Sequence, residues 1–371
     1  MSARRLFWNF AAAVAALIFA FGVAAVALTL VGLDPVFAFK EMANFAASVA
    51  SFISIINRAT PLFVSAIAVA IGFKMGLFNI GVEGQYLLAA LFAAYLGAQV
   101  TLWAPLHVVF ILAIAMVVGA LWAGIAGALK VARGIHEVIS TIMLNFMAIG
   151  LSAYFFINFF REDPAALNLF TAPIPPSGWL PSLNPVLERL GFEVPGSQNL
   201  TSFALIAILI GVFYYLLVWR TRFGYDLRAS GINAFAAQTS GVDRNQMVLK
   251  TMLLSGAMAG LVGMSPLLSF QHQYVSDFPV QLGFTGIAVA LVGRNHPVGI
   301  ALAALLFGLM DRSALILDVR GIPREIIVII QGTVVLAVVV AYEVVTRIVE
   351  RQEVRAAARA TGELDEEELA A

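Results

Sequence analysis

Charged residues are scarce in this sequence, and cysteine is missing altogether. Of 371 residues, 12% are charged and 61% are apolar, whereas an average soluble domain has roughly 25% charged residues. Without cysteine, disulfides, thiolate metal sites and cysteine nucleophiles are excluded. The formal net charge is zero, so nothing in the charge balance indicates a nucleic-acid partner.

Two further absences limit the functions that this chain can perform. The sequence has no Gly-x-x-x-x-Gly-Lys-Ser/Thr loop, so it carries no phosphate-binding loop of that kind. Its histidines are scattered and lack the spacing of metal ligands; they are His107, His136, His272 and His296. No apolar stretch carries a regular series of arginines, which argues against voltage sensing. We therefore expect no catalytic residue and no metal site on this chain.

Long apolar runs dominate the sequence. Mean hydropathy is +0.92, and many runs reach about 20 residues, enough to cross a ~30 Å hydrocarbon layer at about 1.5 Å per residue. The windows predict spans at about 7–31, 60–76, 82–101, 105–129, 137–159, 202–219, 248–269, 283–293, 297–317 and 325–345. The predicted fold is all-α: a polytopic transmembrane helical bundle of about ten spans, including broken or re-entrant segments.

The basic residues predict the orientation of the bundle. The first apolar run is longer than the core of a typical signal peptide, so we interpret it as a retained span. With a cytoplasmic amino terminus, most of the 22 basic residues fall inside, in agreement with the positive-inside rule, and both termini are cytoplasmic. We expect a transmembrane domain at 1–345, with a proline-rich extracytoplasmic loop at 161–200 and a cytoplasmic loop at 220–250. Residues 346–371 form a cytoplasmic charged tail.

Polar residues and glycines meet in the stretch from Lys74 to Gln85, between two predicted spans. Its glycines permit a break in the helix, and such a break is tolerated at membrane depth only where protein or a water-filled cavity satisfies the backbone. Asn79, Glu83 and Gln85 are therefore candidates for a translocation pathway or a hinge. Alternatively, the stretch is a short turn, and Glu83 stabilises the start of a helix.

Glu137, Thr141 and Asn145 recur at intervals of four on one predicted span, which places them on one helix face. Polar groups within a span face the bundle interior, because lipid offers them no hydrogen-bond partner. Asn145 either lines a solute path or joins two helices through its side chain.

The loop at 220–250 contains a predicted short helix. Asn233 can cap its start, alanines propagate it to Ser240, and Gly241 can end it. Such a helix can dock into a groove of another protein, but its spacing alone favours an ordinary surface helix. A second glycine-interrupted apolar segment, residues 282–299, indicates a broken or re-entrant helix near a binding site.

Five ordered blocks of this sequence resemble the permease subunits of nucleoside and simple-sugar ABC importers. They are Gly76–Gln85, Glu137–Asn145, Gly231–Gly241, Gly286–Gly293, and Gly321–Glu325 with Gln331–Gly332. The likeness covers about residues 55–345. The first block is most similar to the branch that works with basic-membrane-lipoprotein binding proteins and takes up nucleosides.

The resemblance implies a partner for each missing function. It implies a separate ABC ATPase subunit that binds ATP and magnesium, a second homologous permease, and an extracytoplasmic substrate-binding lipoprotein, all at a bacterial cytoplasmic membrane. It reverses the interpretation of the inner loop, whose residues then couple to the ATPase: Gly231, Asn233, Ala236, Ser240 and Gly241. The substrate pathway would involve Asn79, Glu83, Gln85, Thr141 and Asn145. No cofactor is then expected on this chain.

Two alternatives remain open. A simple sugar such as ribose or galactose is the nearest alternative substrate. An ion-coupled secondary transporter would also use broken helices and a carboxylate such as Glu83, but it would transport without ATP.

Overall fold

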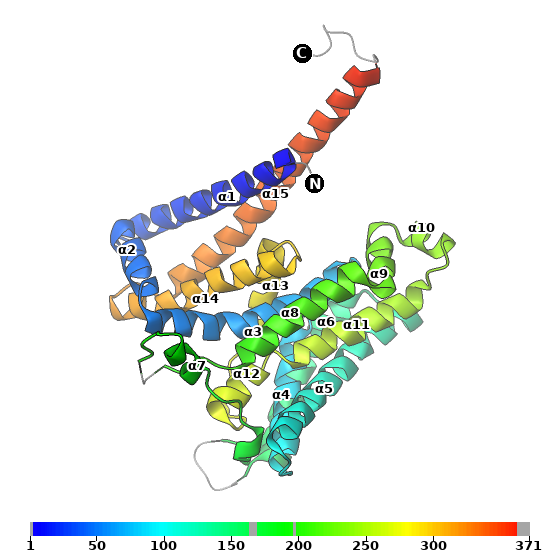
Figure 1. Ribbon diagram of the computed structural model, residues 1–371. Coiled ribbons are helices and arrows are strands. Elements are labelled where there is room, and N and C mark those ends of the chain that lie inside the picture. Colours follow the sequence, from blue (N-terminus) through cyan, green and yellow to red (C-terminus); the bar gives the residue numbers. More distant parts are fainter. Residues whose placement is uncertain (1–2, 163–168, 196–197, 362–371) are drawn as a thin grey trace. The chain divides into compact units, whose positions relative to one another are not determined.

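The computed structural model describes residues 3–162, 169–195 and 198–361 (Figure 1). Over these ranges the chain is mostly helical and has isolated β-bridges but no named strand, which confirms the predicted all-α class. The α-helices are α1 (Ala3–Leu30), α2 (Pro35–Ala46), α3 (Val49–Phe73), α4 (Val82–Ala98), α5 (Ala104–Arg133), α6 (Glu137–Phe155), α7 (Asn184–Arg189), α8 (Phe203–Arg220), α9 (Arg222–Ile232), α10 (Ala234–Thr239), α11 (Arg244–Gly260), α12 (Met264–Pro266), α13 (Leu282–Val292), α14 (Pro297–Val319) and α15 (Glu325–Thr361). Three short segments have other helical geometry: η1 (Phe156–Phe160), η2 (Pro176–Gly178) and η3 (Leu267–Gln271).

Each of the ten predicted windows overlaps a helix. Seven helical segments of the described chain are long and apolar enough to cross a membrane: α3, α5, α6 with η1, α8, α11 through η3, α14 and the part of α15 before the tail. The apolar helices at Ile18–Leu30, Val82–Ala98 and Leu282–Val292 are shorter. The 11 residues of α13 span only about 17 Å at 1.5 Å per residue. A total of ten spans stays a prediction.

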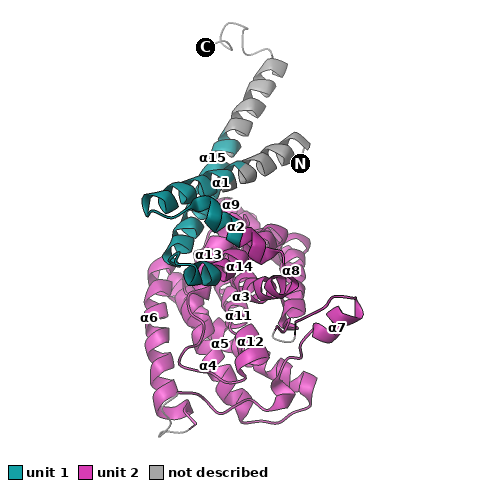
Figure 2. Cartoon of the chain, turned by 90° about the vertical axis from the view of Figure 1, so that its left-hand side faces the viewer, with its two compact units in different colours: residues 1–41, 314–371 teal, residues 42–313 magenta. Residues whose placement is uncertain are grey.

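The described chain divides into two compact units, which Figure 2 colours separately. Unit 1 comprises residues 1–41 and 314–371, and in it α1 packs along α15. Unit 2 comprises residues 42–313 and contains all the residues predicted for the pathway and for coupling. In the predicted tail, α15 continues to Thr361, and residues 362–371 lie outside the described residues.

Helix α3 begins 11 residues before the predicted window. Ser48 caps it by accepting a hydrogen bond from the amide of Ser51, and the polar residues that interrupt the hydropathy of this region have partners elsewhere. Arg58 forms an ion pair with Asp311 of α14 at 2.6 Å. A hydropathy window cannot anticipate an ion pair that joins two distant helices, so it begins the span too late.

Small residues bring α5 and α11 into close contact in unit 2. A Cβ atom on Gly119 would lie 2.3 Å from the carbonyl oxygen of Gly256, and one on Gly260 would lie 2.0 Å from that of Ala115. Small residues permit such close backbone approach between helices in a membrane. These two helices therefore form a tightly packed centre that supports the neighbouring break between α3 and α4.

Two groups of connecting segments lie at opposite ends of the unit 2 helices. Figure 1 shows α9 and α10 beyond one end of α8 and α11, and α7 and α12 towards the other end. The predicted loop 161–200 has little helix over its described part, and it is tied to η3 by bonds such as that from Leu180 N to Leu268 O at 2.9 Å. The described residues do not include 163–168, which contain Pro164, or 196–197.

Candidate functional site

The break between α3 and α4 is built around a reciprocal amide pair. Asn79 Nδ2 donates to Gln85 Oε1 at 2.9 Å, and Gln85 Nε2 donates to Asn79 Oδ1 at 2.8 Å. Asn79 Nδ2 also donates to Ser255 Oγ at 2.8 Å. Gly76 in this break has a φ of +72°, which residues with a Cβ rarely adopt. The sequence analysis predicted the helix break from these glycines. It did not identify Ser255 of α11 as a hydrogen-bond partner of Asn79.

Asn145 joins α6 to the same break. Its Oδ1 accepts a hydrogen bond from Gly84 N at 2.8 Å, and its Nδ2 donates to Ile80 O at 2.8 Å. Thr141, one turn earlier, donates to the backbone oxygen of Glu137 at 2.7 Å. Asn145 was expected either to line a solute path or to join two helices, and the structure contains the hydrogen bonds that join them.

Glu83 lies in the first turn of α4, but its carboxylate bonds to another helix. Gln281 N donates to its Oε1 at 2.6 Å, and Gly283 N donates to its Oε2 at 2.8 Å, at the start of α13. Tyr86 Oη donates to Oε1 at 2.9 Å. The free N–H groups and the dipole of a helix start favour a negative charge there. Glu83 therefore fixes the short helix α13 against α4, a contact between residues about 200 positions apart that no local pattern indicates.

All five predicted pathway residues are buried and belong to the surroundings of one break. Their exposed fractions are 1% for Asn79, 3% for Glu83, 1% for Gln85, 0% for Thr141 and 4% for Asn145. A buried polar group costs free energy unless it is hydrogen-bonded, and the bonds above supply that stabilisation. The structure thus brings these residues together as a polar network between helices. Their contact with a solute stays a prediction.

The predicted short helix in the inner loop is confirmed as α10. Asn233 caps it, because its Oδ1 accepts from Phe235 N at 3.1 Å and from Ala236 N at 3.0 Å. Ser240 Oγ donates to Ala236 O at 2.9 Å, and Gly241 ends the turn with a φ of +89°. The capped helix presents a large apolar side chain to its surroundings, since Phe235 is 77% exposed.

Gly231 anchors this loop to the break. A Cβ atom on Gly231 would lie 2.3 Å from the carbonyl oxygen of Lys74, so the backbones of α9 and the break touch. The loop and the polar network are therefore parts of one contiguous assembly.

Positively charged side chains gather at the contact between Gly231 and Lys74. Burial, and then the neighbouring Arg228 and Arg294, lower the pKa of Lys74 from its ordinary value. The Lys74 ammonium lies 5.1 Å from the ring centroid of Trp219, a cation–π contact that stabilises its charge.

Comparison with known families defines the class. Residues 51–339 match the family described as branched-chain amino acid transport system / permease component. With seven helical segments of the described chain long and apolar enough to cross a membrane, this is a multi-pass membrane transport protein. The chain belongs to this permease family.

Individual relatives are consistent with the family match. The guanosine ABC transporter permease protein NupP of Bacillus subtilis is 35% identical over 78% of this chain and 81% of its own length. The glucose ABC transporter permease protein TsgB13 of Haloferax volcanii is 33% identical over 85% and 83%. The nucleoside ABC transporter permease protein NupB of Lactococcus lactis is 28% identical over 88% and 90%. The resemblance drawn from the five sequence blocks is confirmed at the level of the permease family.

Proposed function

We propose that this chain is the membrane-spanning permease subunit of an ATP-driven importer that carries nucleosides inward across a bacterial cytoplasmic membrane. The observation that carries the proposal is the 35% identity, over most of both chains, to a guanosine ABC transporter permease. A second relative, NupB, is a nucleoside permease.

The contact between Gly231 and Lys74 supports a coupling route. In this proposal α10 docks on a separate ABC ATPase, which binds ATP and magnesium and docks differently in its two states. A displacement of α10 passes through α9 to the break between α3 and α4. The amides and hydroxyls of that polar network then exchange their mutual bonds for bonds to water or solute as the path opens.

The proposed topology follows the hydropathy and charge patterns. The bundle has about ten spans, with α4 and α13 as broken or re-entrant segments and both termini in the cytoplasm. Residues 1–345 form the transmembrane domain, and 346–371 form a cytoplasmic tail. Loop 161–200 faces an extracytoplasmic substrate-binding lipoprotein, and a second homologous permease completes the pathway. This chain itself carries no catalytic residue and no cofactor.

A simple sugar is the second candidate substrate, and one observation favours it. The relative TsgB13, at 33% identity over most of this chain, is a glucose ABC transporter permease. Nucleosides and sugars are both neutral, hydroxyl-rich solutes, and the same permease architecture suits either.

Uptake of radiolabelled guanosine, uridine and ribose by cells that express the whole neighbouring gene set tests the proposal. Nucleoside uptake that is lost when the catalytic glutamate of the ATPase is replaced supports it. Asn233→Trp, which removes the cap and adds bulk at the start of α10, should also abolish uptake. The matched control is Val319→Trp, because Val319 is exposed at the end of α14 and lies outside both the coupling loop and the 161–200 loop. Uptake of ribose alone would favour the sugar candidate, and uptake that is indifferent to the ATPase would refute an importer subunit.

A further inference from the structure

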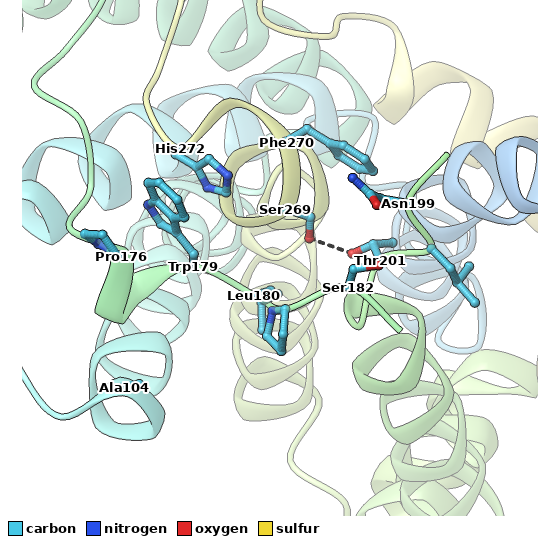
Figure 3. A pocket seen from close by; sticks show the side chains of 12 residues that line it. Ala104, Pro176, Trp179, Leu180, Ser182, Asn199, Thr201, Ser269, Phe270 and His272 are labelled. Carbon is cyan, nitrogen blue, oxygen red and sulfur yellow. Dashed lines mark hydrogen bonds between the residues drawn. The ribbon is translucent and has the colours of Figure 1, made fainter. Parts of the chain in front are cut away.

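A cavity of about 440 Å³ opens in unit 2 (Figure 3), among the connecting segments near α7 and α12 that lie away from α10 (Figure 1). The 161–200 loop contributes Trp179, Ser182 and Asn199, and Thr201 follows just before α8. Ser269 and His272 close the side next to η3. The volume lies within the range of about 300–1,000 Å³ that small-molecule sites occupy.

One wall of the cavity is a rigid aromatic surface. The rings of Trp179 and His272 are stacked with centroids 3.9 Å apart and planes 16° from parallel. The indole N–H of Trp179 donates to Ile174 O at 2.7 Å, which fixes the ring, while 40% of the residue stays exposed. Figure 3 shows both rings on one side of the opening. A flat heterocycle can stack on such a surface.

The opposite wall carries polar side chains beside Phe270. Asn199 Oδ1 accepts from Asn184 Nδ2 at 3.1 Å, and in Figure 3 the nitrogen of the Asn199 amide points towards the opening. Thr201 and Ser269 share a hydrogen bond of 2.5 Å at the base of this wall. On the aromatic side, His272 Nδ1 is buried and has no hydrogen-bond partner in the described part of the chain.

The lining carries no formal charge. Among the described residues around the cavity there is no aspartate, glutamate, lysine or arginine. Burial lowers the pKa of His272 from its ordinary value, so its ring is neutral at physiological pH. A zwitterionic amino acid or a phosphate would lose its hydration here without gaining an opposite charge. The cavity therefore suits a neutral solute that combines a flat ring with several polar groups.

We propose that this cavity is an outer receiving site of the permease that binds the heterocyclic base of a nucleoside. The stacked rings of Trp179 and His272 together supply the aromatic surface, and the amide nitrogen of Asn199 donates to the polar edge of the base or to the sugar hydroxyls. The inference rests on the proposed function, because it assigns a contact site to the solute class proposed there.

The missing cysteines make a direct test practical. Ser182→Cys would be the sole thiol of the full-length chain, and it lies in the cavity lining. The rate at which a membrane-impermeant maleimide labels it is measured in lipid nanodiscs, with guanosine, uridine, ribose or leucine added. Leu190→Cys, at an exposed position of the same loop, is the control. Guanosine should slow labelling of the first thiol by about tenfold once its concentration is roughly ten times its Kd, and should leave the second unchanged.

Two variants locate the stacking surface. Trp179→Ala, combined with Ser182→Cys, should abolish the protection by guanosine, whereas Trp103→Ala should preserve it, since Trp103 is 76% exposed and lies outside the lining. As a second measurement, Trp179→Ala should raise the KM for guanosine uptake by the whole transporter severalfold, and Trp103→Ala should not.

The outcomes separate the two proposals. If the wild-type transporter takes up nucleosides but guanosine protects neither thiol and Trp179→Ala leaves KM unchanged, the receiving site is refuted and the proposed function stands. Equal protection by ribose and guanosine would also overturn recognition of the base. Uptake of no nucleoside by the wild-type transporter would instead refute the proposed function.

Discussion

Gly231, at the end of α9, lies so close to Lys74 that a Cβ atom on it would be 2.3 Å from the Lys74 carbonyl oxygen and 3.1 Å from Cα of Met75. Both atoms are backbone, so rotation of a side chain cannot relieve the overlap. The exposed helix α10 is thereby attached, through α9, to the backbone of the break between α3 and α4. No side chain other than hydrogen fits at this position.

Gly231→Ala is therefore expected to displace the loop from the break. Overpacking of this kind costs about 1–3 kcal/mol, and coupled uptake should fall further than the amount of folded protein falls. Gly150→Ala is the matched control, because no atom lies within 4 Å of a Cβ there. Uptake per folded transporter is the measurement. Equal uptake by the two variants would show that the contact transmits nothing.

Glu83→Gln is expected to loosen α13. The amide keeps one acceptor, but its NH₂ group would face an N–H of Gln281 or Gly283 that now donates to the carboxylate. Loss of a buried hydrogen bond to a charged group costs about 1.5–3 kcal/mol, visible as a lower midpoint of thermal unfolding in detergent. Glu193→Gln, at an exposed position, should leave the midpoint in place. A Glu83→Gln protein as stable as the wild type would contradict the assigned role of the carboxylate.

The reciprocal pair of Asn79 and Gln85 predicts strong coupling in a double-mutant cycle. Either Asn79→Leu or Gln85→Leu leaves the amide of the other residue buried without its partner, whereas the double variant removes both amides. The double variant should therefore lose less stability than the sum of the single variants, with a coupling energy of about 0.5–3 kcal/mol. Chemical unfolding of the four proteins measures it, and strictly additive losses would show that the amides act independently.

Helix positions could be predicted from the sequence because hydropathy is a local property, and α10 could be predicted because its cap and its terminating glycine are neighbours in the chain. The cluster of pathway candidates was also recognisable, since intervals of four on α6 place Thr141 and Asn145 on one face. The hydrogen-bond partners of these residues could not be predicted. Ser255, which bonds Asn79, comes from a helix far along the chain, and only the tertiary fold selects it.

The outer cavity could not be predicted from the sequence at all, because its lining residues come from distant segments. Trp179 and His272 lie 93 positions apart, in segments that sequence patterns describe only as connections. Their stacking depends on hydrogen bonds such as that from Ile174 N to His272 O at 2.8 Å. His272 also has a φ of +54°, which is rare for a residue with a Cβ. Composition gives no hint of that backbone geometry, so neither residue was singled out for this role beforehand.

His272 predicts a specific loss of stability in acid. Burial lowers its pKa in the folded chain, an effect that a backbone hydrogen bond with Leu268 opposes only in part. The unfolded chain therefore takes up the proton at a higher pH than the folded chain does. The stabilisation is complete above the ordinary pKa of 6.5 and is lost as the pH falls through the folded value.

Thermal unfolding between about pH 4 and pH 7 tests this dependence. His272→Gln should flatten the acid side of the stability curve relative to the wild type. If His272→Gln loses as much stability at low pH as the wild type does, other groups cause the loss.

Arg58 and Asp311 form an ion pair between α3 and α14, with side chains that are 27% and 20% exposed. Charges in a membrane-spanning segment are costly unless paired, so Asp311→Asn leaves Arg58 without its counter-ion. Breaking a buried pair costs about 3–5 kcal/mol, and partial exposure places the expected loss below that range. Asp318→Asn is the matched control, because its pair with Arg324 has the same 2.6 Å separation but side chains 39% and 58% exposed. Exposed pairs contribute only about 0–1 kcal/mol, so Asp318→Asn should be nearly neutral.

The exchange Arg58→Asp with Asp311→Arg should recover part of the stability that either single reversal loses, because the attraction is restored even where the packing is not. If the exchange is no better than the single reversals, the two charges do not stabilise the contact between these helices.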